Sequence, residues 1–300
     1  MLINLVAIGG SNGQIEVYNS SSLLLVNSFH AHSWNIYRIK QLPNGYVATC
    51  SIDNTAKIWN VTTINSINSW NLIRTYTHAS SVYSIEFINA DTMASGSWDQ
   101  SIKIWSISTG ATLLTINTGD HVYSLQLLSN AFYLAAGLYG GQISIYDINN
   151  NGSLVSTLTG HTYQVNDLVL LNSNLLASSS ADSTVLIWDL TTSTHKFNLT
   201  GHFQAVTGLK LVSSDTLASG AGDYAVKLWN TTSGTLIRTL ANHTSDIYWS
   251  VDILISNHIL VSGSWDQTIK TWNISTGQVL NTIQTGLHIF SLAALNPPPV

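Results

Sequence analysis

Histidine, hydroxyl and aspartate side chains recur at matched spacings, and together they could supply a nucleophile, its base and an orienting acid. Five histidines precede an aspartate, by 21 residues in four cases and by 23 in the last. A tryptophan follows each of these aspartates after six residues. Five copies at one period indicate a repeated structural device rather than a reaction centre. We therefore predict that the protein is not an enzyme and has no catalytic residues.

These sets belong to a repeat that organises the whole chain. Residues 95–105 (SGSWDQSIKIW) return almost unchanged as residues 262–272 (SGSWDQTIKTW). An aromatic residue ends an alternating run in each unit, at steps of 41 to 46 residues, namely Tyr18, Trp59, Trp105, Tyr146, Trp188, Trp229 and Trp272. Each unit has four short runs rich in Val, Ile, Leu and Ser, which predicts four strands. A period of about 40 to 45 residues is typical of one four-stranded blade.

The chain resembles the WD-repeat β-propeller family through these units, over essentially all 300 residues. The resemblance implies an all-β fold, a seven-bladed β-propeller of four-stranded antiparallel blades in a single domain, 1–300. Because 289–295 (IFSLAAL) matches the first strand of other units, we predict that it pairs with the N-terminal blade and closes the ring. The predicted blades are 1–29 plus 289–295, 36–77, 82–118, 122–159, 165–200, 206–241 and 247–284.

The resemblance also implies a structural role for the recurring polar residues. In the family, a loop histidine, a strand Ser or Thr, a turn aspartate and the tryptophan form a hydrogen-bonded chain. The sets here are His32/Thr49/Asp53/Trp59, His78/Ser95/Asp99/Trp105, His161/Ser178/Asp182/Trp188, His202/Ser219/Asp223/Trp229 and His243/Ser262/Asp266/Trp272. Two units lack the set, with Gly140 and Asn12 at the aspartate position. Their histidines, His121 and His288, directly precede the first strand and do not align with the other five.

The resemblance further implies a protein-binding face, formed by the loops before the first strand and between the second and third strands. Here that face would carry Trp34, Trp98, Tyr139, Tyr163, Phe203, Trp249 and Trp265. Aromatic side chains often anchor interfaces, and the alternative is that they pack against neighbouring loops. We predict a non-catalytic protein–protein interaction scaffold. The alternative is a self-associating structural subunit of an extracellular, N-glycosylated assembly or filament.

Composition argues against several function classes. Charged residues make up 8% of the chain and the net charge is −5, whereas an ordinary soluble domain has roughly 25% charged residues. Ten scattered Lys and Arg residues do not form a nucleic-acid footprint. No apolar run approaches the roughly 18 residues of a membrane span. The lone cysteine, Cys50, allows neither a disulfide framework nor a cysteine metal site. We expect no nucleic acid, membrane insertion, metal or cofactor.

Asparagine-x-Ser/Thr triplets begin at Asn19, Asn60, Asn151, Asn198, Asn230, Asn242 and Asn273. Several follow the tryptophan strand, where asparagine is first of all a turn residue. They could accept glycans only in a secreted protein. The family resemblance favours a cytoplasmic location, and the low charge and the triplets leave an extracellular location as the alternative.

Overall fold

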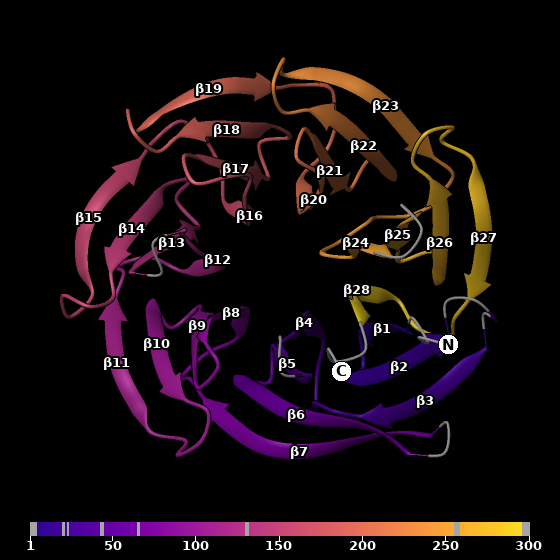
Figure 1. The fold of residues 1–300 in the computed structure, drawn as a ribbon, viewed down its shortest axis with the longest axis horizontal. Helices are drawn as coiled ribbons and strands as arrows, with labels where there is room; N and C mark the ends of the chain where they lie inside the picture. Colours follow the sequence, from indigo (N-terminus) through magenta and orange to yellow (C-terminus); the bar gives the residue numbers. More distant parts are fainter. Residues whose placement is uncertain are drawn as a thin grey trace.

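The computed structural model shows seven antiparallel sheets of four strands each, arranged in a ring (Figure 1). The structure describes residues 5–19, 22, 24–42, 45–64, 67–129, 132–254 and 259–295, without the side chains of 62–68. All regular structure in these residues is β-strand. The predicted all-β, seven-bladed propeller is confirmed.

The blades follow one another around the ring in sequence order. Blade 1 contains β28 (Ile289–Leu295), β1 (Leu5–Gly10), β2 (Gln14–Asn19) and β3 (Leu25–His30). Blade 2 contains β4 (Ile36–Gln41), β5 (Tyr46–Ser51), β6 (Thr55–Ile64) and β7 (Ile67–Thr77). Blade 3 contains β8 (Val82–Asn89), β9 (Thr92–Ser97), β10 (Ser101–Ser106) and β11 (Thr112–Asn117). Blade 4 contains β12 (Val122–Leu127), β13 (Tyr133–Leu138), β14 (Ile143–Asp147) and β15 (Ser153–Leu158).

The remaining three blades repeat this order from the inner to the outer strand. Blade 5 contains β16 (Val165–Leu170), β17 (Leu175–Ser180), β18 (Val185–Asp189) and β19 (Thr194–Leu199). Blade 6 contains β20 (Val206–Ser213), β21 (Thr216–Ala221), β22 (Ala225–Asn230) and β23 (Thr235–Ala241). Blade 7 contains β24 (Val251–Leu254), β25 (Ile259–Gly263), β26 (Thr268–Asn273) and β27 (Val279–Gln284).

The last strand of the chain completes the first blade, as predicted. β28 pairs antiparallel with β1, in a register that runs from Leu5↔Leu295 to Gly9↔Ser291. The Ser291 hydroxyl donates to the Ile36 carbonyl oxygen of blade 2, at 2.9 Å. The Ala294 amide of β28 donates to an Asp252 carboxylate oxygen of blade 7, also at 2.9 Å. β28 therefore holds three blades together and closes the ring through non-covalent contacts.

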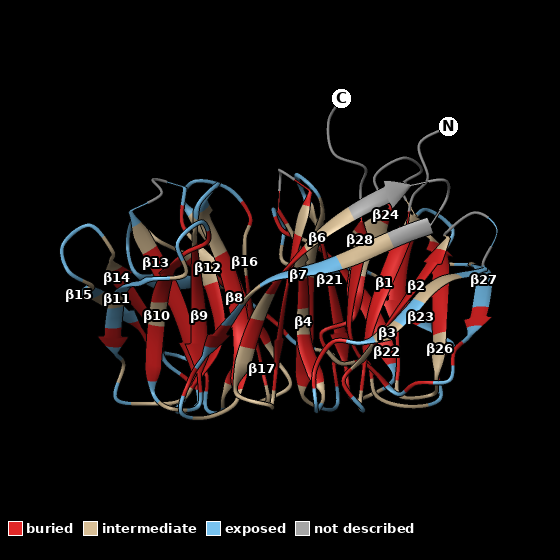
Figure 2. Ribbon diagram, turned by 90° about the horizontal axis from the view of Figure 1, so that it is seen from below, coloured by how far each residue is buried: buried red, intermediate tan, exposed pale blue. Residues whose placement is uncertain are grey.

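Most of the hydrophobic core lies in clusters between neighbouring blades, and the second strands are largely buried (Figure 2). One further cluster, which includes Tyr37 and Trp249, joins several blades near the ring axis. The small residues of the second strands allow the blades to approach. A Cβ at Gly96 of β9 would lie 2.5 Å from Val122 Cγ1 of the next blade. A Cβ at Gly220 of β21 would lie 2.7 Å from Ile247 Cγ2. Any larger side chain at these positions would push two blades apart.

Two sets of loops share one face of the ring. The turn between the second and third strands pairs with the loop before the first strand, because the Trp98 amide donates to the Ser81 carbonyl and the Tyr139 amide to the His121 carbonyl. We call this face the histidine-loop face. The opposite face carries the loops between the first and second strands, and there β1 begins and β28 ends.

Candidate functional site

Four side chains in each of five blades form one hydrogen-bonded chain, called the tetrad below. In blade 5, Trp188 Nε1 donates to Ser178 Oγ at 2.7 Å. Ser178 Oγ lies 2.7 Å from His161 Nε2, and His161 Nδ1 lies 2.8 Å from Asp182 Oδ2. The structure brings the other four sets together through the same three contacts, at 2.7–2.9 Å.

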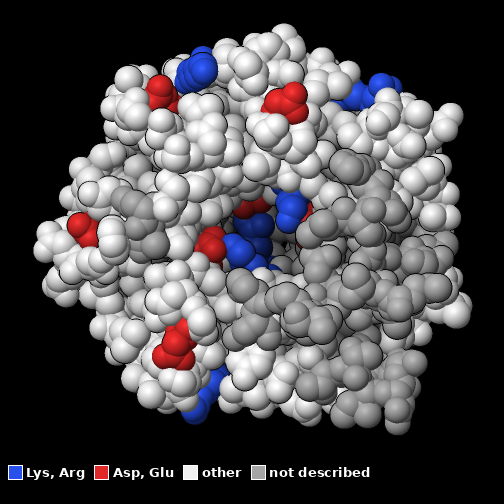
Figure 3. All heavy atoms as spheres, in the orientation of Figure 1, with Lys and Arg blue, Asp and Glu red and all other residues white. Residues whose placement is uncertain are grey.

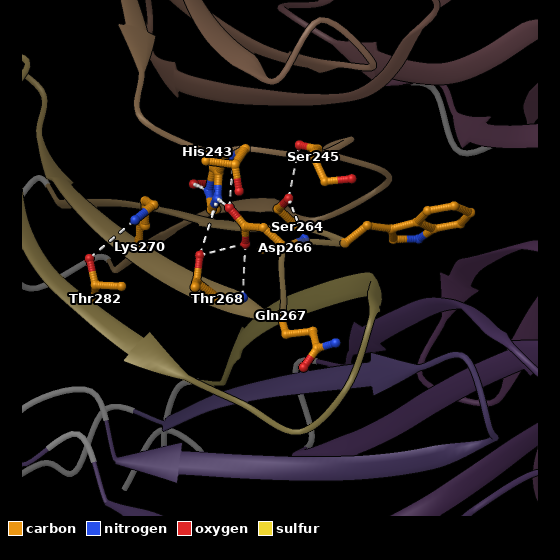
Figure 4. Close-up of polar contacts among 12 residues, drawn as sticks. His243, Ser245, Ser264, Asp266, Gln267, Thr268, Lys270 and Thr282 are labelled. Atoms are coloured by element: carbon orange, nitrogen blue, oxygen red, sulfur yellow. Dashed lines mark hydrogen bonds and ion pairs between the residues drawn. The ribbon is translucent and has the colours of Figure 1, made fainter.

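The tetrad aspartate receives further hydrogen bonds, which Figure 4 shows for blade 7. Asp266 Oδ1 accepts from the Thr268 hydroxyl at 2.6 Å and amide at 2.9 Å, and Oδ2 accepts from the Thr244 amide at 3.0 Å. The equivalent hydroxyl residues are Thr55, Ser101 and Thr184. Blade 6 has Ala225 there, and only its amide donates. The sequence interpretation missed this fifth member, although Asp-x-Ser/Thr in four of the five units signals it.

The donor and acceptor groups of the tetrad fit a neutral histidine. An indole N–H only donates and an ionised carboxylate only accepts. The central hydroxyl therefore accepts from tryptophan. With a neutral imidazole, the hydroxyl donates to Nε2 and the Nδ1–H donates to aspartate. Burial lowers the pKa of His32 and His78, against the opposing effect of Asp53 and Asp99. A lowered pKa favours the neutral imidazole in these two tetrads.

The tetrad aspartates remain ionised for a complementary reason. Burial alone would raise the pKa of Asp53, Asp182 and Asp266. Hydrogen bonds from the histidine, the nearby hydroxyl and a loop amide outweigh burial, and they hold each pKa well below its usual range. The carboxylate thus fixes the loop, the turn and the third strand of its blade.

The tetrad hydroxyls, which by residue type alone could have been nucleophiles, lie in the interior of the blades and not at a surface. The five residues are each 0% exposed, namely Thr49, Ser95, Ser178, Ser219 and Ser262. A nucleophile requires access to a reacting atom, and burial denies these hydroxyls that access.

The same hydroxyls are also already hydrogen-bonded within their tetrads. The hydroxyls of Ser95, Ser219 and Ser262 accept from the tryptophan of their own tetrad at 2.7, 2.8 and 2.8 Å. The same three oxygens lie 2.7, 2.7 and 2.8 Å from Nε2 of the tetrad histidine. Each hydroxyl is therefore hydrogen-bonded to two side chains of its own tetrad. The geometry supports a structural role for these residues.

Blades 1 and 4 lack the tetrad and use another contact at the same place. His121, which precedes blade 4, stacks on Trp98 of blade 3 with ring centroids 4.9 Å apart. Its Nδ1 lies 2.6 Å from the Trp98 carbonyl oxygen. His288, which precedes blade 1, packs against Trp265 of blade 7 at 6.1 Å, and its Nδ1 lies 2.7 Å from the Trp265 carbonyl oxygen. These two histidines tie their loops to the preceding blade.

The predicted partner-binding residues divide into exposed and covered groups. Four are well exposed on the histidine-loop face, namely Phe203 at 86%, Tyr163 at 65%, Trp34 at 63% and Tyr139 at 51%. Trp98 is about one third exposed and stacks on Tyr83 as well as on His121. Trp265 is partly buried against Tyr248 and Phe290. Packing against neighbouring loops, which is the alternative given in the sequence analysis, therefore covers much of the Trp98 and Trp265 side chains.

Trp249 requires a correction, because it does not lie on the exposed face. It is 7% exposed, and its Nε1 donates at 2.8 Å to the Asn166 carbonyl oxygen of blade 5. Ile247 occupies the place against Gly220 that Val122 occupies against Gly96. The register with β25 shows where the two extra residues of this unit fall, because Asp252 pairs with Val261 as Lys210 pairs with Ala218 in blade 6. One extra residue lies between Ile247 and Asp252 and the other between Asp252 and Val261. Trp249 lies next to the first of these insertions and is directed toward the ring axis.

Trp249 belongs to an aromatic layer that the sequence interpretation did not identify. Tyr37, Tyr83, Tyr123 and Phe290 are the second residues of four inner strands and are all buried. Tyr37 stacks on Tyr83 at 4.4 Å and meets Trp249 at 5.2 Å and Phe290 at 5.6 Å. These rings come from blades 1, 2, 3, 4 and 7, so they fill the axis of the ring near the histidine-loop face. Apolar–aromatic pairs such as Val82-Tyr83 at the start of four first strands were the available signal.

Other predicted features can be placed briefly. Within the described ranges, no three His, Cys, Asp or Glu side chains are grouped to hold a metal ion, and no helix could cross a membrane. Cys50 is buried and unpaired. Of the glycosylation candidates, Asn151, Asn198 and Asn242 are exposed, whereas Asn230 and Asn273 accept hydrogen bonds within their own turns. Glycosylation stays a prediction.

Comparison with known proteins identifies the class that this fold and these tetrads define. The family described as "WD domain, G-beta repeat" matches residues 24–60, 70–106, 152–189, 193–230 and 234–273. These matches cover more than half of the chain, so the chain belongs to the WD-repeat family. The unmatched stretch 107–151 includes the three inner strands of blade 4, which lacks the tetrad.

Individual relatives share only segments with this chain. Protein GFS12 of Arabidopsis thaliana is 43% identical over 61 residues, which are 20% of this chain and 4% of the relative. Protein SPA1-RELATED 3 of the same organism is 32% identical over 90 residues, 30% of this chain and 11% of the relative. WD repeat-containing protein 89 homolog of Dictyostelium discoideum is 39% identical over 74 residues, 24% of this chain and 20% of the relative.

A solved structure shows the same fold. The crystal structure of the WD40 beta propeller domain of Doa1 superposes with a TM-score of 0.74 and 22% sequence identity, over 87% of this chain and 86% of that one. WD-repeat propellers generally act in protein interaction and are generally non-catalytic.

Proposed function

We propose that the protein is a non-catalytic scaffold that binds a partner protein through the histidine-loop face. The observation that carries the proposal is the exposure of Trp34, Tyr139, Tyr163 and Phe203 on that face. Covering a large apolar side chain contributes about 1.5–3 kcal/mol. Exposed aromatic residues are therefore strong candidates for binding anchors.

The tetrads hold three of these anchors in place. Phe203 directly follows the tetrad histidine His202, and its amide donates at 3.1 Å to Asp223 of the same tetrad. Trp34 and Tyr163 lie two residues after their tetrad histidines. A loop that is ordered before binding loses less conformational entropy when a partner docks. The tetrads thus have a functional consequence, because they hold the loops that present these aromatic side chains.

The triple change Trp34→Ala/Tyr163→Ala/Phe203→Ala tests the proposal. We expect partner affinity to fall at least about 100-fold, since truncating one hot-spot residue typically costs about 2 kcal/mol. The melting temperature should hardly change, because all three side chains are solvent-exposed. Affinity capture with quantitative mass spectrometry would identify proteins retained by the wild type and lost by the variant, and titration would then give their dissociation constants.

Three exposed leucines on the outer rim provide the matched control, Leu113→Ala/Leu154→Ala/Leu236→Ala. This variant should retain the partners that the loop-face variant loses. Equal capture by the wild type and the loop-face variant would contradict the proposal.

Self-association through the outer rim is the second candidate function. The outer strand of each blade pairs on one side only. None of the seven contains Asp or Glu, and the only Lys or Arg residues in them are Arg74, Lys196 and Arg238, one in each of three strands. Six of them expose aliphatic side chains, including Leu25, Leu72, Leu113, Leu154, Leu236 and Leu280. Edge strands are commonly protected by charge, and weakly charged surfaces associate readily. The partner that best matches this surface is therefore the outer rim of a second copy of the protein.

Native mass over a range of concentrations separates the two candidates. If the rim associates, the mass should rise with concentration, and Leu113→Lys/Leu154→Lys/Leu236→Lys should restore the monomer by adding like charges to the edges. A wild-type monomer of 32.6 kDa at every concentration would exclude rim association.

A further inference from the structure

The centre of the ring contains a cavity that opens on the face opposite the histidine loops. Its volume is about 580 Å³, within the range of about 300–1,000 Å³ that is typical of small-molecule sites. The aromatic layer closes its inner end, where Trp249 contributes to the wall. Figure 3 looks into the mouth and shows Lys or Arg and Asp or Glu side chains gathered in the hollow.

Four of the charged side chains in the wall occupy a single position of the repeat. The residues of the inner strands that pair with Ala7, Ala48, Ala94, Ala135, Ala177, Ala218 and Val261 are Ala293, Lys40, Glu86, Gln126, Val169, Lys210 and Asp252. Two ion pairs connect neighbouring blades at this level, Lys40–Glu86 at 2.6 Å and Lys210–Asp252 at 2.5 Å. Figure 1 places β4 and β20, which carry the two lysines, on opposite sides of the ring axis.

A third pair lies deeper in the cavity. Arg38 Nη2 of blade 2 contacts Asp167 Oδ1 of blade 5 at 2.6 Å. The Arg38 guanidinium lies 5.6 Å from the centroid of the Trp249 ring. Arg38 therefore spans the cavity just next to the aromatic layer.

The cations face the open cavity more than their carboxylate partners do. The side chains of Lys40 and Lys210 are each 41% exposed, whereas those of Glu86 and Asp252 are 7% and 13% exposed. Asp252 Oδ2 also accepts from the Ala294 amide, and its counterpart in the deeper pair, Asp167 Oδ2, accepts from the Leu209 amide. An ammonium carries three N–H donors, and the contacts to Glu86 and Asp252 leave donors on both lysines for a ligand.

We propose that this cavity binds a small molecule that carries two or more anionic groups, either carboxylates or phosphates. One group contacts Lys40, another contacts Lys210 across the axis, and the deepest group contacts Arg38. The ion pairs keep the lysines extended from the wall, and Asp252 raises the pKa of Lys210, so that this ammonium stays protonated. Hydrogen bonds to charged groups in such a recess are stronger than those between neutral groups. The proposal is independent of partner binding on the other face.

Calorimetric titration of the purified protein with citrate and, separately, with pyrophosphate tests the site and distinguishes carboxylate from phosphate ligands. We expect at least one probe to bind with a 1:1 stoichiometry, and its affinity to fall as salt is added. The decisive variant is Lys210→Met/Asp252→Asn, which removes the cation while it keeps the net charge of the wall unchanged. Its affinity should fall at least about tenfold, because one charge-assisted contact is lost.

Two further variants complete the experiment. Lys40→Met/Glu86→Gln makes the same charge-neutral change on the opposite wall. It replaces Lys210→Met/Asp252→Asn as the test of the site if that variant does not fold. Lys196→Met removes an exposed cation from the outer strand β19 and should leave the affinity unchanged. The proposal is overturned if neither probe binds the wild type at millimolar concentration. It is also overturned if the charge-neutral wall variant that folds binds as tightly as the wild type.

Discussion

Removal of residues 289–300 should abolish the cooperative thermal transition and leave most of the protein aggregated. The truncation deletes β28, whose Ile289, Phe290, Leu292 and Leu295 are all buried. Burial of each such side chain contributes about 1.5–3 kcal/mol, so the combined loss approaches the total stability of about 5–15 kcal/mol that is typical of a domain. The deletion also leaves the edge of β1 without a partner, and an unpaired edge promotes aggregation.

A shorter truncation provides the control for this result. Deletion of residues 296–300 retains the whole of β28. The melting temperature of this shorter protein should stay close to that of the full chain. Circular dichroism melting and sedimentation of both truncations would measure the difference. If the protein lacking 289–300 melted like the wild type, β28 could not be the element that closes the ring.

The fold could be predicted from the sequence because all seven units repeat one pattern of short strands, and five of them also repeat one set of polar residues. The Leu5–Gly10 run matches the second strands of other units and 289–295 matches their first strands, so the closure followed from the repeat itself. The family resemblance implied the tetrads, and the recurring spacing, 21 residues from histidine to aspartate in four units and 23 in the fifth, assigned the partners within each unit. Periodicity therefore carries information about contacts within a blade.

Contacts across the ring axis could not be predicted in the same way. Tyr37 and Phe290 occupy the same position of the repeat, but their contacts with each other and with Trp249 join blades 1, 2 and 7. Arg38 likewise reaches Asp167 in a distant blade. Trp249 was misplaced because one extra residue between Ile247 and Asp252 disturbs the register that the other units share. These features depend on how the blades are arranged, which the repeat of one blade does not encode.

The tetrads should contribute strongly to stability, and Ser178→Ala should destabilise the fold by about 1–3 kcal/mol. The Ser178 hydroxyl accepts from Trp188 Nε1 and lies 2.7 Å from His161 Nε2. Its removal leaves two buried groups without a partner, while the volume of the side chain hardly changes. Equilibrium denaturation in urea, followed by fluorescence, would measure the change in the free energy of unfolding.

The neighbouring residue in β17 is a closely matched control. Ser179 is also fully buried, but its hydroxyl has no hydrogen-bond partner among the described residues. Ser179→Ala removes a buried polar group that makes no compensating bond, so it should be neutral or slightly stabilising. The two variants delete the same atom from adjacent positions and differ in whether that atom is bonded. Equal destabilisation by both changes would mean that the tetrad hydrogen bonds do not support the blade, whereas a selective loss in Ser178→Ala would show that they do.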